Sequence, residues 1–410
     1  MRGDMRLMIG TRKGAFVYTS DQRRREWQIS EPMMPGWSIS HLAADTRDGS
    51  TRLYAGANHW AWGPSVSRSD DGGKNWDPRS PGLGFPTDMN VAMQSVWNVR
   101  PGLESQPGVV YAGTQPAGLF RSEDRGESWA PVDGINRHPL RKFWTGTGGG
   151  DSCIPSIEID PRDASHVYVS VAAGFSYVTR DGGKTWDMCS HRAIPTSPEA
   201  RMAVEEIQAP SPPPDLEPAA AEEFQTKMKQ ILAGFEEQIG QVIPPGVDPA
   251  AANEFHKMRL DEKNPDRLWG QAHIGVFRTD DGGENWQDVT TGLPSFHGFP
   301  IAVTRRQPDA VYVVPLDFQD NNIRVCKGQF AVYRTRDAGK SWEGLTNGLP
   351  GPDDYQSVYR EAMDTDGLDS EGVYVGTTNG QVYASTNGGD HWQRLPGTLP
   401  PILSVTCATF

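Results

Sequence analysis

One short pattern, Ser/Thr-x-Asp-x-Gly-x-x-Trp, recurs along most of the chain and constrains its fold more than any other feature. In each copy the Asp carboxylate can accept hydrogen bonds from the backbone N–H groups that follow it, and the Gly supplies a positive φ. The Trp then falls on the next strand, where its ring covers the turn. Each copy therefore predicts the turn of a β-hairpin. The complete copies are Ser69–Trp76, Ser122–Trp129, Thr179–Trp186, Thr279–Trp286 and Thr335–Trp342.

Two more copies are degenerate but keep their place in the repeat. Ser385–Trp392 has Asn387 in place of Asp, and Thr19–Trp27 has Arg where Gly is expected, with one residue extra. The seven Trp residues are 49, 53, 57, 100, 56 and 50 positions apart. The long interval contains residues 190–252, which carry no copy of the pattern, so the number of repeat units stays at seven.

The sequence before each turn predicts three further strands, and residues 109–114 and 118–122 illustrate two of them with alternating apolar side chains. Each unit is therefore a four-stranded sheet, with strands A to D in chain order and the repeated turn between C and D. Seven such units predict one seven-bladed β-propeller over residues 1–410. The first unit lacks its strand A, and a spare strand follows the last unit at residues 401–408. We expect this spare strand to pair into the first blade and close the ring.

Residues 190–252 are predicted to be an insertion between blades 4 and 5. Its first part, residues 195–216, is Pro-rich and predicts an extended linker. Residues 217–240 then place apolar side chains on one stripe of a helix, with Phe224 the first of them. Three interpretations stay open for this helix: packing on the flank or rim of the propeller, a lid, or a dimer contact.

The formal charge of −13 argues against binding to nucleic acid or to an anionic membrane, since both need a basic surface. There is no apolar run of 18 residues, and strand-like sequence begins at Arg6 without a signal peptide, so a cytoplasmic location is expected. The four cysteines, Cys153, Cys189, Cys326 and Cys407, are far apart and are expected to be reduced.

The repeated turn is the Asp-box, or BNR, signature. The chain therefore resembles the Asp-box propeller superfamily, which includes sialidases, sortilin-type receptors, family 74 xyloglucanases and photosystem II assembly factors. It also resembles bacterial proteins described as glycosyl hydrolase or BNR-like repeat proteins. The resemblance covers nearly the whole chain and implies the fold strongly, whereas these relatives share little chemistry.

Sialidase activity is not expected from this resemblance. Sialidases are six-bladed and carry an Arg-Ile/Leu-Pro motif before the first box, whereas here Arg394-Leu395-Pro396 follows the last box. Family 74 xyloglucanases use two propellers with a cleft between them, and this chain supplies one.

Propeller topology brings the B–C turns and the D–A connections to one face around the central channel, here called the upper face. We expect a polar small ligand, such as a sugar or an organic acid, or else a protein partner, to bind there. The candidate ligand-binding residues are Arg12, Lys13, His41, His59, Trp60, Trp62, Gln115, Trp144, His273, His297, Gln319 and Arg324. A glycoside hydrolase is the alternative, with two catalytic carboxylates drawn from Asp88, Asp151, Asp317 and Asp320.

Two further points stay open. Trp60 and Trp62 either contact a ligand or pack between blades. No cofactor is expected. A second alternative is a metal ion bound by His41, His59, His273 or His297, if these side chains converge on the channel. No His-x-His or His-x-x-x-His spacing in the sequence supports this alternative.

Overall fold

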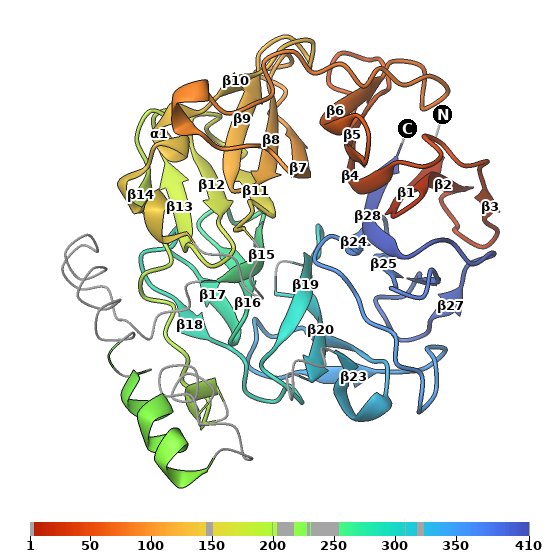
Figure 1. The fold of residues 1–410 in the computed structure, drawn as a ribbon. Helices are drawn as coiled ribbons and strands as arrows, with labels where there is room; N and C mark the ends of the chain where they lie inside the picture. The colour runs from red at the N-terminus through yellow and green to blue at the C-terminus, as the bar shows by residue number, and fades with distance from the viewer. Residues whose placement is uncertain are drawn as a thin grey trace.

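The computed structural model shows a ring of seven twisted sheets around a central channel (Figure 1). It describes residues 4–144, 151–198, 200–202, 217–227, 230, 254–307, 309–317 and 324–409. The seven-bladed propeller predicted from the repeats is confirmed. Within the described ranges, no helix is both long enough and apolar enough to cross a bilayer.

The blades follow one another along the chain, and each is antiparallel. Blade 1 consists of β28 (Ile402–Thr409), β1 (Met5–Thr11), β2 (Gly14–Ser20) and β3 (Gln28–Ile29). Blade 2 consists of β4 (Ser38–Asp45), β5 (Arg52–His59) and β6 (Gly63–Ser69). Blade 3 consists of β7 (Ser95–Pro101), β8 (Val110–Gln115), β9 (Gly118–Ser122) and β10 (Ala130–Pro131). Blade 4 consists of β11 (Ser156–Ile159), β12 (Val167–Ser170), β13 (Ser176–Thr179) and β14 (Asp187–Met188). Blade 5 consists of β15 (Phe255–Leu260), β16 (Leu268–Ala272), β17 (Val276–Thr279) and β18 (Gln287–Asp288).

Blades 6 and 7 complete the ring. Blade 6 consists of β19 (Gly298–Val303), β20 (Val311–Asp317), β22 (Val332–Thr335) and β23 (Glu343–Leu345), with β21 (Arg324–Val325) paired to β20. Blade 7 consists of β24 (Met363–Thr365), β25 (Val373–Gly376), β26 (Val382–Ser385) and β27 (Gln393–Arg394). Short helices lie in the connections: η1 (Thr87–Met89), α1 (Asp133–Asn136), η2 (Pro139–Phe143) and η5 (Cys326–Gly328).

The C-terminal strand closes the ring as predicted. β28 pairs with β1 from Met5↔Thr409 to Thr11↔Ile402, and it supplies the innermost strand of blade 1. The two ends of the chain therefore lie side by side in one sheet (Figure 1).

The Asp-box turns have the hydrogen bonds expected from their sequence. In the box of blade 4, Asp181 Oδ1 accepts from the backbone N–H groups of Lys184 and Thr185, both at 3.0 Å, and Gly183 has a φ of 98°. Trp186 is buried in a cluster that joins blades 3 and 4. In the degenerate first box, Arg24 takes the Gly position at a φ of 55°, and its guanidinium donates to Asp366 of blade 7 at 2.7 Å.

Irregular pairing recurs in the innermost strands. The register shifts between Ile39 and His41 in β4, and between Val96 and Asn98 in β7. It shifts again around His256 in β15 and between Gly298 and Ile301 in β19. A β-bulge places an extra residue in one strand and re-aims its side chains. The pairing of β1 with the innermost strand β28 also shifts between Gly10 and Thr11, so five blades carry such irregularities in the described strands that line the channel.

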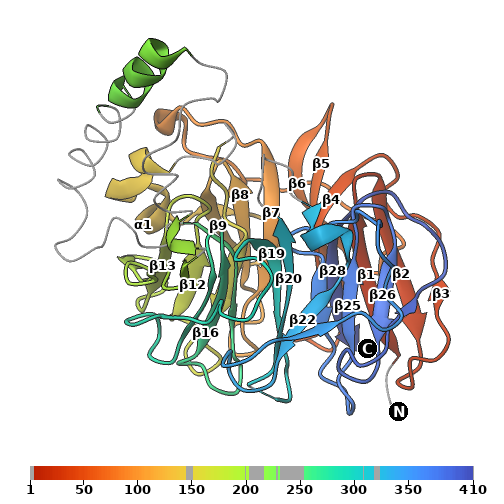
Figure 2. The same ribbon diagram turned by 90° about the horizontal axis from the view of Figure 1, so that it is seen from below.

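The insertion begins differently from the prediction. Residues 198 and 200–202 are helical, within the stretch that was expected to be extended. Ser197 caps this turn by accepting from Ala200 N at 3.2 Å, and Pro198 fits the first helical position. Residues 218–227 are helical as predicted, with Phe224 half-buried, whereas the other residues of the apolar stripe lie outside the described residues. Figure 2 shows this helix on the same side of the ring as the tip of the β5–β6 hairpin.

Candidate functional site

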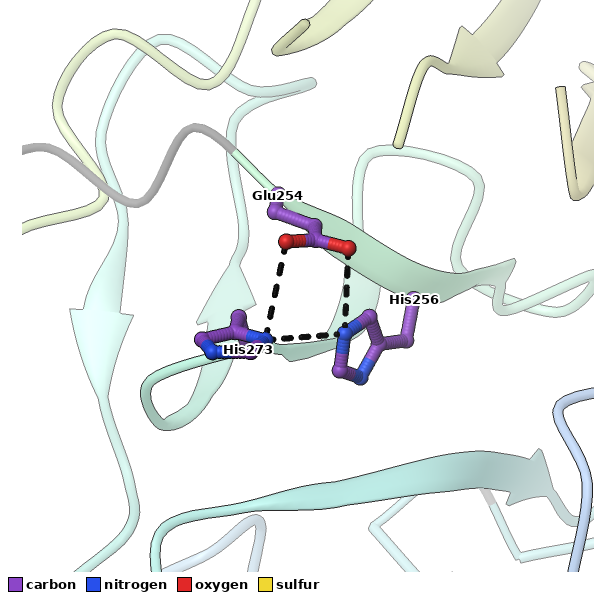
Figure 3. Close-up of side chains that lie close together, drawn as sticks. All are labelled: Glu254, His256 and His273. Carbon is purple, nitrogen blue, oxygen red and sulfur yellow. Dashed lines mark hydrogen bonds and ion pairs between the residues drawn. The ribbon is translucent and has the colours of Figure 1, made fainter. Parts of the chain in front are cut away.

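Three acid-base side chains of blade 5 meet at the upper end of the channel (Figure 3). Glu254 immediately precedes β15, and His256 is the residue at the bulge of that strand. His273 lies in the turn between β16 and β17, which returns to the start of β15. Each of the three residues offers one metal-ligating atom, and these atoms all lie within 4.8 Å of one another.

The contacts within this cluster are close. His256 Nε2 lies 3.3 Å from Glu254 Oε1, and His273 Nδ1 lies 3.5 Å from Glu254 Oε2. The same two imidazole nitrogens are 3.3 Å apart. Glu254 and His256 are buried, whereas the His273 side chain is 20% exposed, so solvent reaches the cluster from the His273 side.

Backbone carbonyls determine which ring nitrogens carry protons. His256 Nδ1 lies 2.6 Å from the carbonyl oxygen of Gly298, which can only accept a hydrogen bond, so a neutral His256 carries its proton on Nδ1. Its Nε2 lone pair then faces Glu254 and His273. His297, which precedes β19, likewise places Nδ1 3.0 Å from the carbonyl of His273 and holds the β16–β17 turn. Such carbonyl contacts are typical of histidines that ligate metals.

The environment keeps the imidazoles neutral and the carboxylate charged. Burial lowers the pKa of His273 to about 4, and burial together with the neighbouring His256 and His273 lowers that of His297 to about 3. Burial also lowers the pKa of His256. Burial would raise the pKa of Glu254, but the hydrogen bond and charge that His256 supplies when protonated, the charge of a protonated His273 and the charge of Arg360 lower it to about 2. At neutral pH the cluster is therefore an anionic set of electron-pair donors.

The metal-free protein is expected to lose stability as the pH falls from about 6.5 to about 4. In this range the unfolded chain protonates its histidines, whereas the native cluster resists protonation, so the stability present above pH 6.5 is progressively lost. Each proton bound only by the unfolded state changes the free energy of unfolding by about 1.4 kcal/mol per pH unit. Urea unfolding in a chelator at pH 7 and pH 5 measures the effect.

His273→Gln should flatten this pH dependence of stability, because it removes one histidine of the cluster. His391→Gln is the control and should leave the pH dependence unchanged. His391 is an exposed histidine in the Asp-box turn of blade 7. An equal pH dependence in all three proteins would contradict the assignment to the cluster.

Below the histidines, a buried charge pair fills the channel. Lys257 Nζ donates to Glu361, and both side chains are buried. Glu361 also accepts from Asn98 Nδ2 at 3.4 Å and lies 3.7 Å from His41 Nε2. His41 thus lies inside β4 rather than in the upper connection where it was predicted, and it lines a cavity of about 350 Å³ near the other end of the channel. It does not join the histidine cluster.

The predicted residues of blades 1 and 2 lie on the rim. Trp60 and Trp62 are 93% and 79% exposed at the tip of the β5–β6 hairpin, so the alternative in which they pack between blades is wrong. His59 lies beneath them, with ring centroids 5.8 Å from Trp60 and 6.4 Å from Trp62. Arg12 and Lys13 are exposed in the β1–β2 turn.

A second polar pocket lies near blades 3 and 4. Trp144, Asp151 and Arg141 line it together with Asn90 and Gln94, and its volume is about 370 Å³. Gln94 donates to the Asp151 carboxylate, and Gln115 Nε2 donates to the Asp151 carbonyl at 2.9 Å.

The candidate catalytic carboxylates have separate partners. Asp88 is exposed and pairs with Arg137 at 2.8 Å, and Asp317 accepts from the backbone N–H of Lys327 at 3.2 Å. Gln319 and Asp320 lie outside the described residues, as does the side chain of Arg324. None of the contacts of the described residues joins two of these carboxylates.

Glu254 and His256 were missed by the sequence reasoning. Their signal is Glu-x-His at the start of a strand, since residues two apart in a strand share one face. This spacing differs from the His-x-His and His-x-x-x-His patterns of metal sites, and the bulge at His256 has no sequence signature of its own.

The comparisons with known proteins agree with this architecture. A model of the BNR/Asp-box repeat matches residues 177–188. A probable oligoxyloglucan-reducing end-specific xyloglucanase of Neosartorya fischeri is 24% identical over 59% of this chain and 26% of its own length. The corresponding enzyme of Emericella nidulans is 25% identical over 58% of this chain and 25% of its own length.

The chain thus spans about a quarter of the length of these curated relatives. Among solved structures, an ancestral GH74 enzyme superposes with a TM-score of 0.55 at 16% identity, covering 88% of this chain and 39% of that one. This likeness concerns the fold alone. The ring of seven sheets is a seven-bladed β-propeller, and the matched BNR/Asp-box repeat covers the turn of its blade 4.

Proposed function

We propose that this propeller binds a divalent transition-metal ion through Glu254, His256 and His273, and that the ion binds a polar small molecule at the upper end of the channel. The observation that carries the proposal is the convergence of three donor atoms within 4.8 Å of one another. His297 supports the site by holding the turn of His273.

Electrostatics supports an ion between these groups. The Nε2 lone pair of a neutral His256 faces the Glu254 carboxylate at 3.3 Å, and two electron-pair donors this close repel each other unless a cation or a proton lies between them. The lowered pKa values of the histidines disfavour the proton.

The spacing and the chemistry of the donors also fit a metal ion. Donors about 2.1 Å from a tetrahedral ion are roughly 3.4 Å from one another. Here the two imidazole nitrogens are 3.3 Å apart, and each lies 3.3 or 3.5 Å from a different oxygen of the Glu254 carboxylate. Two imidazoles and one carboxylate suit zinc or iron better than calcium or magnesium, which prefer oxygen ligands. Three protein ligands leave a coordination position open, as in catalytic sites.

Elemental analysis of the purified protein tests the proposal. We expect about one equivalent of transition metal after dialysis against zinc or iron(II), and an affinity at least about 100-fold weaker in Glu254→Gln or His273→Gln. His391→Gln is the matched control and should retain the metal. A metal-free unaltered protein, or equal metal content in the His273→Gln variant, would overturn the proposal.

Glycoside hydrolysis is the second candidate, because the curated relatives are named as xyloglucanases. Two carboxylates about 5–10 Å apart would be needed across the sugar, and Asp151 in the pocket beside Trp144 is the best placed of the described candidates. Cleavage of a xyloglucan oligosaccharide that persists in a chelator and is lost in Asp151→Asn would establish this alternative in place of metal-dependent chemistry.

A further inference from the structure

Arg360 reaches across the upper end of the channel from the segment before β24 of blade 7. Its Nη2 lies 3.4 Å from Glu254 Oε1 of blade 5, and its Nη1 lies 3.6 Å from Cys153 Sγ, just before blade 4. Its guanidinium carbon is 5.3 Å from the ring centroid of Trp97 and 5.4 Å from that of Phe299. These rings belong to blades 3 and 6, which flank the channel, so they fix the plane of the guanidinium.

The hydrogen-bonding capacity of Arg360 is poorly used. A guanidinium has five N–H donors, yet the Nε atom of Arg360 is buried and has no hydrogen-bond partner among the described residues. The contact with Glu254 is a single long one rather than a bidentate pair. The Cys153 thiol adds no negative charge, because burial raises its pKa to about 12. The side chain of Arg360 is nevertheless only 14% exposed.

The charge balance points to a missing anion. Among the residues that the structure describes, a divalent ion bound by neutral imidazoles would, together with Arg360, bring three positive charges against the single negative charge of Glu254. The nearby Glu361 is paired with Lys257 and does not compensate them. Buried charge without a counter-charge is costly, so a site of this composition favours an anionic ligand.

We propose that Arg360 and the metal position together bind the carboxylate of a small organic acid, an inference that rests on the proposed function. One carboxylate oxygen occupies the open coordination position of the ion, and the other accepts from the guanidinium. The planar fork of arginine matches the planar carboxylate, and two rings already hold it in place.

Calorimetric titration of the metal-loaded protein with succinate tests this inference, with uncharged succinamide and inorganic phosphate as comparison ligands. Metal content is measured for every protein before titration. We expect succinate to bind at least tenfold more tightly than succinamide or phosphate. Its affinity should fall about tenfold in Arg360→Lys, which keeps the charge but not the fork, and 10- to 100-fold in Arg360→Gln.

Arg305→Gln is the matched control, since Arg305 lies in the cavity at the other end of the channel. Should Arg360→Gln fail to fold, Arg360→Lys carries the test because it still compensates Glu254. Absence of metal from the unaltered protein overturns the proposed function and this inference together. Metal without succinate binding, or succinate binding that does not depend on Arg360, overturns this inference alone. Phosphate that binds as tightly as succinate overturns the assignment to a carboxylate.

Discussion

Deleting residues 401–410 is expected to abolish the cooperative thermal unfolding transition of the protein. β28 is the innermost strand of blade 1, and its loss leaves β1 paired only with β2 and unpaired along its inner edge. Val405 N also donates to the backbone carbonyl of Glu361 in blade 7 at 2.9 Å, and Thr406 Oγ1 donates to the Leu42 carbonyl of blade 2 at 2.9 Å. The strand therefore connects three blades.

The size of this effect follows from burial. Ile402, Val405 and Cys407 are buried in the core around blades 1, 6 and 7. Each large apolar side chain removed from water contributes about 1.5–3 kcal/mol, and a folded domain is stable by only about 5–15 kcal/mol. Circular dichroism during heating measures the transition, and deletion of Phe410 alone is the control. A truncated protein that melts within a few degrees of the full chain would show that the ring does not depend on its closing strand.

Replacing Glu361 by Gln is expected to lower the free energy of unfolding by about 3–5 kcal/mol, because it leaves a buried ammonium without its counter-charge. Lys257 has a fully buried side chain, and Glu361 is its carboxylate partner. The double variant Lys257→Met/Glu361→Gln should regain most of the loss, since it removes the orphaned charge as well. Urea unfolding at pH 7 measures both.

The cost of Glu361→Gln should shrink at higher pH. Burial, with Arg259 nearby, already lowers the pKa of Lys257 from 10.5 to about 8 in the intact pair. Without the carboxylate the native lysine loses its proton at a lower pH than in the intact pair, whereas the unfolded chain binds the proton up to about pH 10.5. Up to about pH 8, the stability of the variant therefore rises more steeply with pH than that of the intact protein, and above this pH both rise alike. A loss below 1 kcal/mol, or a loss that does not change between pH 7 and pH 9, would contradict the role of this pair.

The repeats predict the fold because each Asp-box turn is a local structure. Asp181 and Gly183 lie two residues apart and form their turn with their immediate neighbours, so short-range sequence is sufficient. The closing strand is also predictable, because a unit without strand A needs a partner from elsewhere in the chain. Even Arg24, which breaks the pattern, keeps the turn by taking a positive φ and pairing with Asp366.

The candidate site is harder to predict because it depends on contacts between blades. Topology predicts His273 and His297 on the upper face, and in the structure their ring centroids are 4.9 Å apart. Glu254 and His256 were missed because their convergence depends on the bulge in β15 and on the carbonyl of Gly298 in the next blade. Arg360 was missed for a similar reason, since its partners are 100 or more positions away.

The contacts of Arg360 and Glu361 determine when the proposed site can form during synthesis of the chain. The ribosome makes blades 5 and 6 before residues 360 and 361 emerge, and until then neither the guanidinium beside Glu254 nor the counter-charge of Lys257 exists. Prematurely terminated chains therefore lack a working site even when most blades have been made. If the proposed site binds its ligand, binding in a cell extract should report only chains that extend beyond residue 361.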